Sequence, residues 1–566
     1  MRKLSAVLSV LCILFVVDIA LAQDEDEEPT LRVNGYLQTQ TGVFVPLGLD
    51  GIFDKDRAFQ DHKNRSYETI TLGGSDDRVQ YDRPCDPART PTKECQPIDH
   101  GGKAGSASML RGTLQLEADW TPFEELNIHG VLQGVRALAL SQDYWAQPPK
   151  YFEVDDRPEW VVDNQYNRFD LREIYLDYYM TDNLSFRLGR QQVTWGETGQ
   201  YRLLDVINPV DTTWHFGPLE SFQDTRIPLW IAKMLIEFPA IEHNLEFVWV
   251  PGFDRPEDSV TVPLSFVGAW GLPPTNTPSP FMILEKKFMY PSRDMPDSMR
   301  GGFRWKGNLG KRISYSLVYY YTHQLSPPVP VAYDLAPVMN PTTGEPFEGV
   351  FDSNTMQTLY LDFPRQHITG FTFEYTFDNP IGMVAKLETA IEPDRTFPRT
   401  SVSPYKTVDM EYENYTQRYQ FNPVQKPVIS YAVVLMRPTM IRWLNPTQNF
   451  LFLLQWMHTI IPDISDVENV DLVNVPGLNE YTITTNSWKI VGVMKTSYFH
   501  GFFTPKVIGA YVHPQSGFIT SAFDFRIKDH WRVQLSVTDF FGKDPYTAVG
   551  LIRDRDEVNL RVRFQF

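Results

Sequence analysis

After residue 23 the sequence contains no stretch of about 20 consecutive apolar residues, so it offers no candidate for a transmembrane helix. Cysteine is scarce, with three residues in 566, and no Cys-x-x-Cys or His-x-His motif accompanies them to suggest a metal site. Positive charge is outnumbered: 52 Lys and Arg against 70 Asp and Glu give a formal net charge of −18. These deficits disfavour a helical membrane protein, a metal centre and a nucleic-acid partner, which selects basic surfaces.

The first 22 residues have the pattern of a secretory signal peptide. Arg2 and Lys3 precede an apolar run from residue 4 to 17, and Ala20-Leu21-Ala22 supplies a small-x-small cleavage site. We expect residues 1–22 to be removed and the acidic residues 23–30 to form a solvated periplasmic tail. In an oxidising envelope, Cys85 and Cys95 can form a disulfide across a short loop. An exported chain without a spanning helix can cross a membrane only as a closed barrel, which pairs all its backbone groups.

The segment 557–566 alternates apolar and polar side chains without a fault. Such a strand faces hydrocarbon on one side and water on the other. A half-buried strand of a soluble sandwich shows the same alternation, but Arg561 and Arg563 on the polar side favour the barrel. Phe564 and the terminal Phe566 resemble the assembly signal of outer-membrane barrels. We therefore expect outer-membrane lipid and the barrel-assembly machinery as partners.

The same alternation predicts an all-β, transmembrane, antiparallel up-and-down barrel over residues 31–566, with about eighteen strands and about sixteen as the fallback. The expected strands cover residues 31–45, 107–120, 125–138, 168–180, 184–196, 227–238, 243–251, 298–308, 311–323, 365–377, 381–392, 427–438, 449–462, 486–498, 503–513, 516–527, 531–541 and 557–566. In this plan the longest connections fall on one side, as long extracellular loops do, and both termini lie in the periplasm.

One segment carries a family signature. Residues 187–198 read Arg-Leu-Gly-Arg-Gln-Gln-Val-Thr-Trp-Gly-Glu-Thr, and residues 204–211 read Leu-Asp-Val-Ile-Asn-Pro-Val-Asp. This pattern resembles the Gly-Arg-Gln-x-x-x-Trp-Gly-Glu strand and Ile-Asn-Pro-x-Asp loop of the bacterial outer-membrane family catalogued as domain of unknown function 1302. The resemblance implies an outer-membrane barrel that works in transport, in some members alongside an inner-membrane exporter. It supplies no catalytic residues.

The signature strand changes face along its length. Leu184, Phe186 and Leu188 share one parity, whereas Val193 and Trp195 take the other. A bulge near Gly189-Arg190 would keep all of these residues in lipid and place Trp195 at the outer interface.

The loop that follows is too apolar to remain in water. We expect residues 199–215 to fold into the barrel as a constriction, with Asp205 and Asp211 facing the wall arginines Arg187 and Arg190. The alternative, an extracellular cap whose Arg–Asp pairs serve only folding, stays open. The residues expected at the constriction are Arg187, Arg190, Gln192, Glu197, Asp205, Asn208 and Asp211.

Arginines occupy the polar parity of many expected strands, and Arg111, Arg532, Arg561 and Arg563 are expected on the lumen wall. Rings of arginine select anions, although salt bridges that only brace the barrel would use the same residues. The sequence therefore predicts a passive channel for small polar or amphipathic solutes, without enzymatic activity, cofactor or metal.

Two other functions stay open. A plugged, non-conducting barrel could serve an inner-membrane exporter as its partner. A lipid hydrolase would need a serine, a histidine and a carboxylate on adjacent strands, and the strand histidines show no such companions. These histidines are His129, His323, His367 and His458. The sequence does not specify the oligomeric state.

Overall fold

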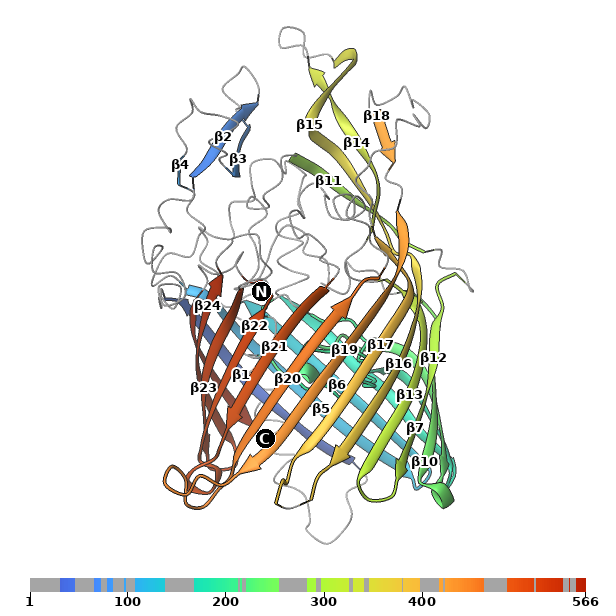
Figure 1. The fold of residues 1–566 in the computed structure, drawn as a ribbon, viewed down its shortest axis with the longest axis vertical. Helices are drawn as coiled ribbons and strands as arrows, with labels where there is room; N and C mark the ends of the chain where they lie inside the picture. The colour runs from blue at the N-terminus through green and yellow to red at the C-terminus, as the bar shows by residue number, and fades with distance from the viewer. Residues whose placement is uncertain are drawn as a thin grey trace.

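The computed structural model is an antiparallel β-barrel (Figure 1). It describes residues 31–45, 66–72, 79–84, 96–97, 107–137, 167–211, 214–215, 220–253, 282–291, 297–324, 329–339, 346–378, 380–397, 417–420, 423–462, 486–513, 516–542, 549 and 556–566. Residues 1–30, Cys85 and Cys95 lie outside this set. The signal peptide, the acidic tail and the disulfide therefore stay predictions.

Eighteen strands form one sheet, which confirms the expected count. Barrel strands that follow one another along the chain pair antiparallel, and β25 pairs with β1 from Tyr36↔Gln565 to Phe44↔Glu557, which closes the barrel. The barrel strands are β1 (Leu31–Phe44), β5 (Ala107–Phe123), β6 (Leu126–Ala137), β7 (Arg168–Thr181), β8 (Leu184–Gln191), β9 (Leu229–Phe238), β10 (His243–Val250), β12 (Arg300–Leu309), β13 (Ile313–His323), β16 (Arg365–Thr376), β17 (Val384–Phe397), β19 (Val424–Thr439), β20 (Phe450–Ile460), β21 (Asn486–Lys495), β22 (Phe503–Val512), β23 (Ser516–Ile527), β24 (Trp531–Gly542) and β25 (Glu557–Gln565).

The wall alternates as the sequence predicts. On β24, Leu535 is 38% exposed on the outer face while its neighbour Ser536 is buried. On β25, Leu560 is 44% exposed while Asn559 is buried. Inside, hydroxyl groups pair across strands, as in the 3.0 Å contact between Thr520 and Thr538. The apolar outer face and polar interior are those of a membrane barrel.

Short turns join the strands at the lower end of the barrel in Figure 1, and the longer connections leave from the upper end. The upper connections contain strands that the sequence did not predict, because their polar and proline-rich residues lack the alternation that lipid imposes. One small sheet holds β2 (Ser66–Leu72), β3 (Val79–Pro84) and β4 (Gln96–Pro97); another holds β11 (Met282–Met289), β14 (Val329–Met339), β15 (Pro346–Asp362) and β18 (Gln417–Gln420). No helix within the described ranges is long and apolar enough to span a membrane.

Strand β8 differs from the expectation. It ends at Gln191 instead of residue 196, and its ladder with β7 runs from Tyr179↔Ser185 to Ile174↔Arg190 without a shift, so the bulge expected at Gly189-Arg190 is wrong. A register shift lies instead in the neighbouring ladder between β6 and β7, where Arg172 of β7 is the extra residue.

The change of parity after β8 has a different cause. The chain leaves the wall and turns into the barrel, so Val193 and Trp195 are buried inside with exposed fractions of 5% and 0%. The expectation that Trp195 meets the outer interface is therefore wrong.

Candidate functional site: a segment that crosses the barrel interior

The described residues of the connection between β8 and β9 (192–211, 214–215 and 220–228) run through the inside of the barrel, and we call them the crossing segment. Asn208 fixes its two ends: the side-chain Oδ1 accepts a hydrogen bond from the amide of Val193 (2.8 Å), and Nδ2 donates to the carbonyls of Ile227 (2.9 Å) and Gln191 (3.2 Å). Because one buried amide bonds both the outgoing and the returning chain, the segment leaves and rejoins the wall at one point.

The chain requires a glycine close to the point where it leaves the barrel wall. Gly189, near the end of β8, has a φ of +138°, and a Cβ there would lie 2.2 Å from the carbonyl oxygen of Ile174. Residues with a side chain rarely adopt such a φ. The glycine that suggested a bulge in the sequence therefore permits a close approach of β8 to β7.

The outgoing limb is the part of the crossing segment before Asn208. Apolar side chains attach this limb to the wall on the far side of the barrel. Leu204 and Ile207 are buried and belong to one cluster with Val318 of β13 and Ala432 of β19. Leu204 approaches β16 so closely that a Cβ on Gly370 would lie 2.2 Å from its Cδ2. Full burial of each such side chain contributes about 1.5–3 kcal/mol.

Two polar side chains of the wall hold the backbone of the same limb. The carboxylate of Glu388 on β17 accepts hydrogen bonds from the amides of Leu204 (2.6 Å), Glu197 (2.7 Å) and Thr198 (3.1 Å). Gln455 on β20 accepts from the amide of Tyr201 (3.2 Å) and donates to its carbonyl (2.9 Å). Backbone groups that strands would satisfy by pairing are satisfied here by the lumen wall.

Two lysines of the barrel wall neutralise Glu197, which lies near the start of this limb. Glu197 pairs with Lys306 of β12 (2.9 Å) and with Lys386 of β17 (3.4 Å). Burial alone would raise the pKa of Glu197, but its hydrogen bond to Lys306 and the charges of both lysines lower it below the ordinary value. Glu197 therefore carries a negative charge that is tied to the wall.

The returning limb is the part of the crossing segment after Asn208. It contains a buried histidine between two carboxylates. The ring nitrogens of His215 lie 3.0 Å from Glu220 and 2.9 Å from Glu557 of β25. In the imidazolium form both nitrogens donate to these carboxylates. Burial would lower the pKa of His215, but the two carboxylates raise it above the ordinary value.

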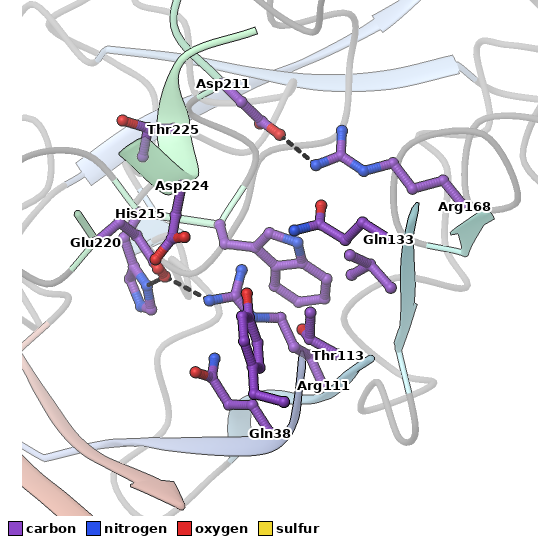
Figure 2. Close-up of a pocket in the computed structure, with 13 residues that line it drawn as sticks. Gln38, Arg111, Thr113, Gln133, Arg168, Asp211, His215, Glu220, Asp224 and Thr225 are labelled. Atoms are coloured by element: carbon purple, nitrogen blue, oxygen red, sulfur yellow. Dashed lines mark hydrogen bonds and ion pairs between the residues drawn. The ribbon is translucent and has the colours of Figure 1, made fainter. Parts of the chain in front are cut away.

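Glu220 is the centre of a charge cluster (Figure 2). It pairs with Arg111 of β5 (2.6 Å) and Arg561 of β25 (3.0 Å) as well as with His215. Burial would raise the pKa of Glu220, but the two guanidinium groups and His215 hold it well below the ordinary value. The cluster fixes the returning limb to the side of the barrel opposite Glu388.

The aspartates of the crossing segment have partners other than those expected. Asp211 pairs with Arg168 of β7 at 2.8 Å (Figure 2), while Asp205 pairs with Arg202 and Arg226 of the segment itself, each at 2.7 Å. The bulged Arg172 donates to three carbonyls of the segment, at Gln223 (2.8 Å), Asp224 (2.9 Å) and Arg226 (2.8 Å).

Arg187 and Arg190 do not face these aspartates, so the expected opposition is wrong. Arg187 forms a bidentate pair with Asp177, and Arg190 pairs with Asp170 at 2.7 Å. Asp177 lies directly across the β7–β8 ladder from Arg187, so the neighbouring strand already neutralises this arginine.

Of the remaining residues that were expected to line the lumen, two contact groups beside the crossing segment and one lies apart from them. Gln192 donates to Glu173 of β7 (2.8 Å), and Arg563 pairs with Asp224 at 3.8 Å while stacking on Tyr36. Arg532 is exposed, and among the described residues it has no ion pair, so it does not join the cluster.

Sequence reasoning missed the residues that hold the crossing segment most directly. These are Arg172, His215, Glu220, Glu388 and Gln455. Glu388 and Gln455 occupy the polar parity of their strands, a signal that marks a lumen position without naming its partner. His215 and Glu220 lie in a loop, where no periodicity predicts a contact.

A small cavity of about 40 Å³ remains beside the returning limb. Its lining includes Gln38, Thr113, Gln133 and Arg168, which Figure 2 shows around the Arg111–Glu220 pair. Since one water needs roughly 10–15 Å³ by this kind of measure, the cavity has room for about three waters.

The strand histidines are bonded to groups other than serine within the described part of the chain. His129 pairs with Asp119 (2.7 Å), and His458 bonds the hydroxyl of Tyr431 (2.9 Å). His367 bonds the hydroxyl of Tyr319, and His323 bonds two backbone carbonyls.

The crossing segment lies within a region that matches a known family model. The model described as "Protein of unknown function (DUF1302)" matches residues 140–566. The chain belongs to this family. The matched residues of this DUF1302 chain include the crossing segment and the signature strand β8. No curated protein matches the sequence.

Solved porin structures are similar to the DUF1302 chain at low identity. OccAB4 of Acinetobacter baumannii is 8% identical, with coverage of 96% of this chain and 100% of that chain and a TM-score of 0.41. A BenF-like porin from Pseudomonas fluorescens Pf-5 is 7% identical, covers 95% and 98%, and has a TM-score of 0.40. OmpF of Salmonella typhi, in complex with daunomycin, is 7% identical, covers 95% and 97%, and has a TM-score of 0.33.

Proposed function

We propose that this protein is a passive outer-membrane channel for small polar or amphipathic solutes, narrowed by the crossing segment and without enzymatic activity. The short turns and both termini lie on the periplasmic side in this proposal. The observation that carries it is the attachment of one segment to opposite parts of the wall, at Glu388 and Gln455 on one side and at Arg111 and Arg172 on the other. A segment held in this way is a fixed constriction and not a loop that swings freely.

The charges along the returning limb favour anions. Five arginines and His215 meet four carboxylates there, so positive charge is in excess. The positive groups are Arg111, Arg168, Arg172, Arg561, Arg563 and His215, and the carboxylates are Asp211, Glu220, Asp224 and Glu557. In a narrow passage, fixed charge is poorly screened and selects ions of the opposite sign.

Planar-bilayer recording of the refolded protein tests the proposal. The wild type should give small, anion-preferring channels, and a variant that lacks residues 199–215 should give larger ones because the passage is wider. A folded wild type and a folded deletion variant that are both silent would contradict the channel function.

A plugged barrel that serves an exporter is the second candidate. The narrow space beside the returning limb favours it, since the cavity of about 40 Å³ there admits water but no larger solute. In this case the wild type is silent and only the deletion variant conducts. The same recordings therefore separate the two functions.

A further inference from the structure

Strands β19 to β22 differ from the rest of the barrel in charge. Residues 424–460 and 486–512, which contain these strands and their two short turns, include no Asp or Glu, although the chain has 70. Arg437, Arg442 and Lys495 lie at the short-turn end of these strands and are exposed. This part of a strongly acidic protein is therefore locally cationic.

An apolar groove of about 410 Å³ lies on the outer face of the same strands. Gly492 and Gly509 face each other across the β21–β22 ladder, and neither has an atom within 4 Å of the position that a Cβ would take. Leu454 and Met494, which are 48% and 40% exposed, line the groove. Two absent side chains thus leave a slot in the wall that faces hydrocarbon.

Arg437 lines this groove at its short-turn end. Its guanidinium has no ion pair or hydrogen bond within the described ranges. A cationic side chain at the edge of the hydrocarbon extends toward the headgroup region, where it finds anions. Guanidinium groups bind phosphate through two parallel hydrogen bonds.

The two short turns below the groove are locked together. Asn445 in the β19–β20 turn donates to Thr496 (3.0 Å) and to the carbonyl of Ser497 (2.8 Å) in the β21–β22 turn. Together the turns present Trp443 and Phe499, which are 83% and 74% exposed. Phe499 has a φ of +52°, which is uncommon for a bulky residue. Exposed aromatics of this kind sit at the headgroup level, so the turns set the depth of Arg437.

We propose that β19–β22 bind one anionic phospholipid in the leaflet at the short-turn end, with an acyl chain in the groove and the phosphate at Arg437 and Arg442. This inference does not require that the lumen conducts. A second copy of the chain on the same surface fits less well, because a twofold contact would bring the cationic patch against itself.

Native mass spectrometry of the full-length protein in a neutral detergent tests the proposal, with dioleoyl phosphatidylglycerol and dioleoyl phosphatidylcholine as probes. The wild type should retain one phosphatidylglycerol at a concentration roughly 30-fold lower than phosphatidylcholine, which is the effect of two basic residues near an anionic headgroup at about 1 kcal/mol each. The double variant Arg437→Gln, Arg442→Gln should lose this preference. Gly492→Leu should weaken the binding of both lipids because leucine fills the groove.

Matched controls come from other parts of the wall. Arg312→Gln removes an exposed arginine from another short turn, and Gly130→Leu fills an outward position on β6 that also has open space beside it. Neither change should alter lipid binding. The shift of unheated samples on a denaturing gel shows that each variant is a folded barrel.

Three results would overturn the proposal. The first is equal retention of the two lipids by the wild type, or an unchanged preference in the folded arginine variant. The second is displacement of the lipid by inorganic phosphate together with no effect of Gly492→Leu, which would indicate a simple anion site. The third is a lipid-free dimer that Gly492→Leu abolishes, which would assign the groove to a second copy.

Discussion

Replacement of Glu388 by alanine should release the crossing segment from the far wall. The Glu388 carboxylate is 0% exposed and accepts hydrogen bonds from the amides of Leu204, Glu197 and Thr198. A hydrogen bond to a charged acceptor contributes about 1.5–3 kcal/mol, but part of this gain offsets the cost of burying the carboxylate. Water that enters the lumen would also satisfy some of the freed amides.

The net loss should therefore be close to the cost of leaving a buried backbone donor without an acceptor, about 1–3 kcal/mol. At about 1.4 kcal/mol per factor of ten, the detached form gains a factor of roughly 5 to 150 relative to the attached form. Single-channel conductance should rise, and limited proteolysis should cleave the segment faster. Glu388→Gln should give a smaller effect because its amide oxygen still accepts.

The matched control is Asp524→Asn. Asp524 is a lumen carboxylate of β23 that accepts from Gln534 at 2.8 Å, within the wall. This variant should leave conductance and cleavage unchanged. Unchanged conductance together with unchanged cleavage in a folded Glu388→Ala barrel would refute the anchoring role of Glu388.

Three further predictions concern the wall and the charge cluster. Leu535→Arg on the outer face should lower the free energy of unfolding by about 2–4 kcal/mol near the midplane, whereas Gln534→Arg in the lumen should cost less; equal costs on refolding into vesicles would contradict the assigned faces. Arg168→Gln should shift the reversal potential in asymmetric salt toward cation preference because Asp211 loses its partner; a folded variant with unchanged selectivity would argue against the returning limb as a filter. The raised pKa of His215 stabilises the fold fully below the ordinary value of about 6.5, and this contribution is lost as the pH rises through the folded-state pKa. The stability difference between wild type and His215→Gln, measured by denaturant titration, should therefore shrink with rising pH, and a constant difference would exclude a charged His215.

Strand parity was predictable because lipid and water impose it on every barrel residue separately. The ranges of β1, β23 and β25 required only the alternation of their own residues. Closure was also implied, since an open edge in lipid would leave backbone groups unpaired. The strands of the upper connections escaped prediction because water surrounds those segments and sets no period.

The sequence by itself determined that the chain forms a barrel of about eighteen strands, which face of most strands meets lipid, and that the apolar loop after β8 needs shelter. Only the tertiary structure decided the partners inside. Glu388 meets Leu204 from a distance of 184 residues, and His215 meets Glu557 from a distance of 342. Local sequence could not assign these pairs, because any polar lumen residue satisfies the alternation equally well. Closure of the barrel selects one partner, because it places one residue of one strand next to the crossing segment.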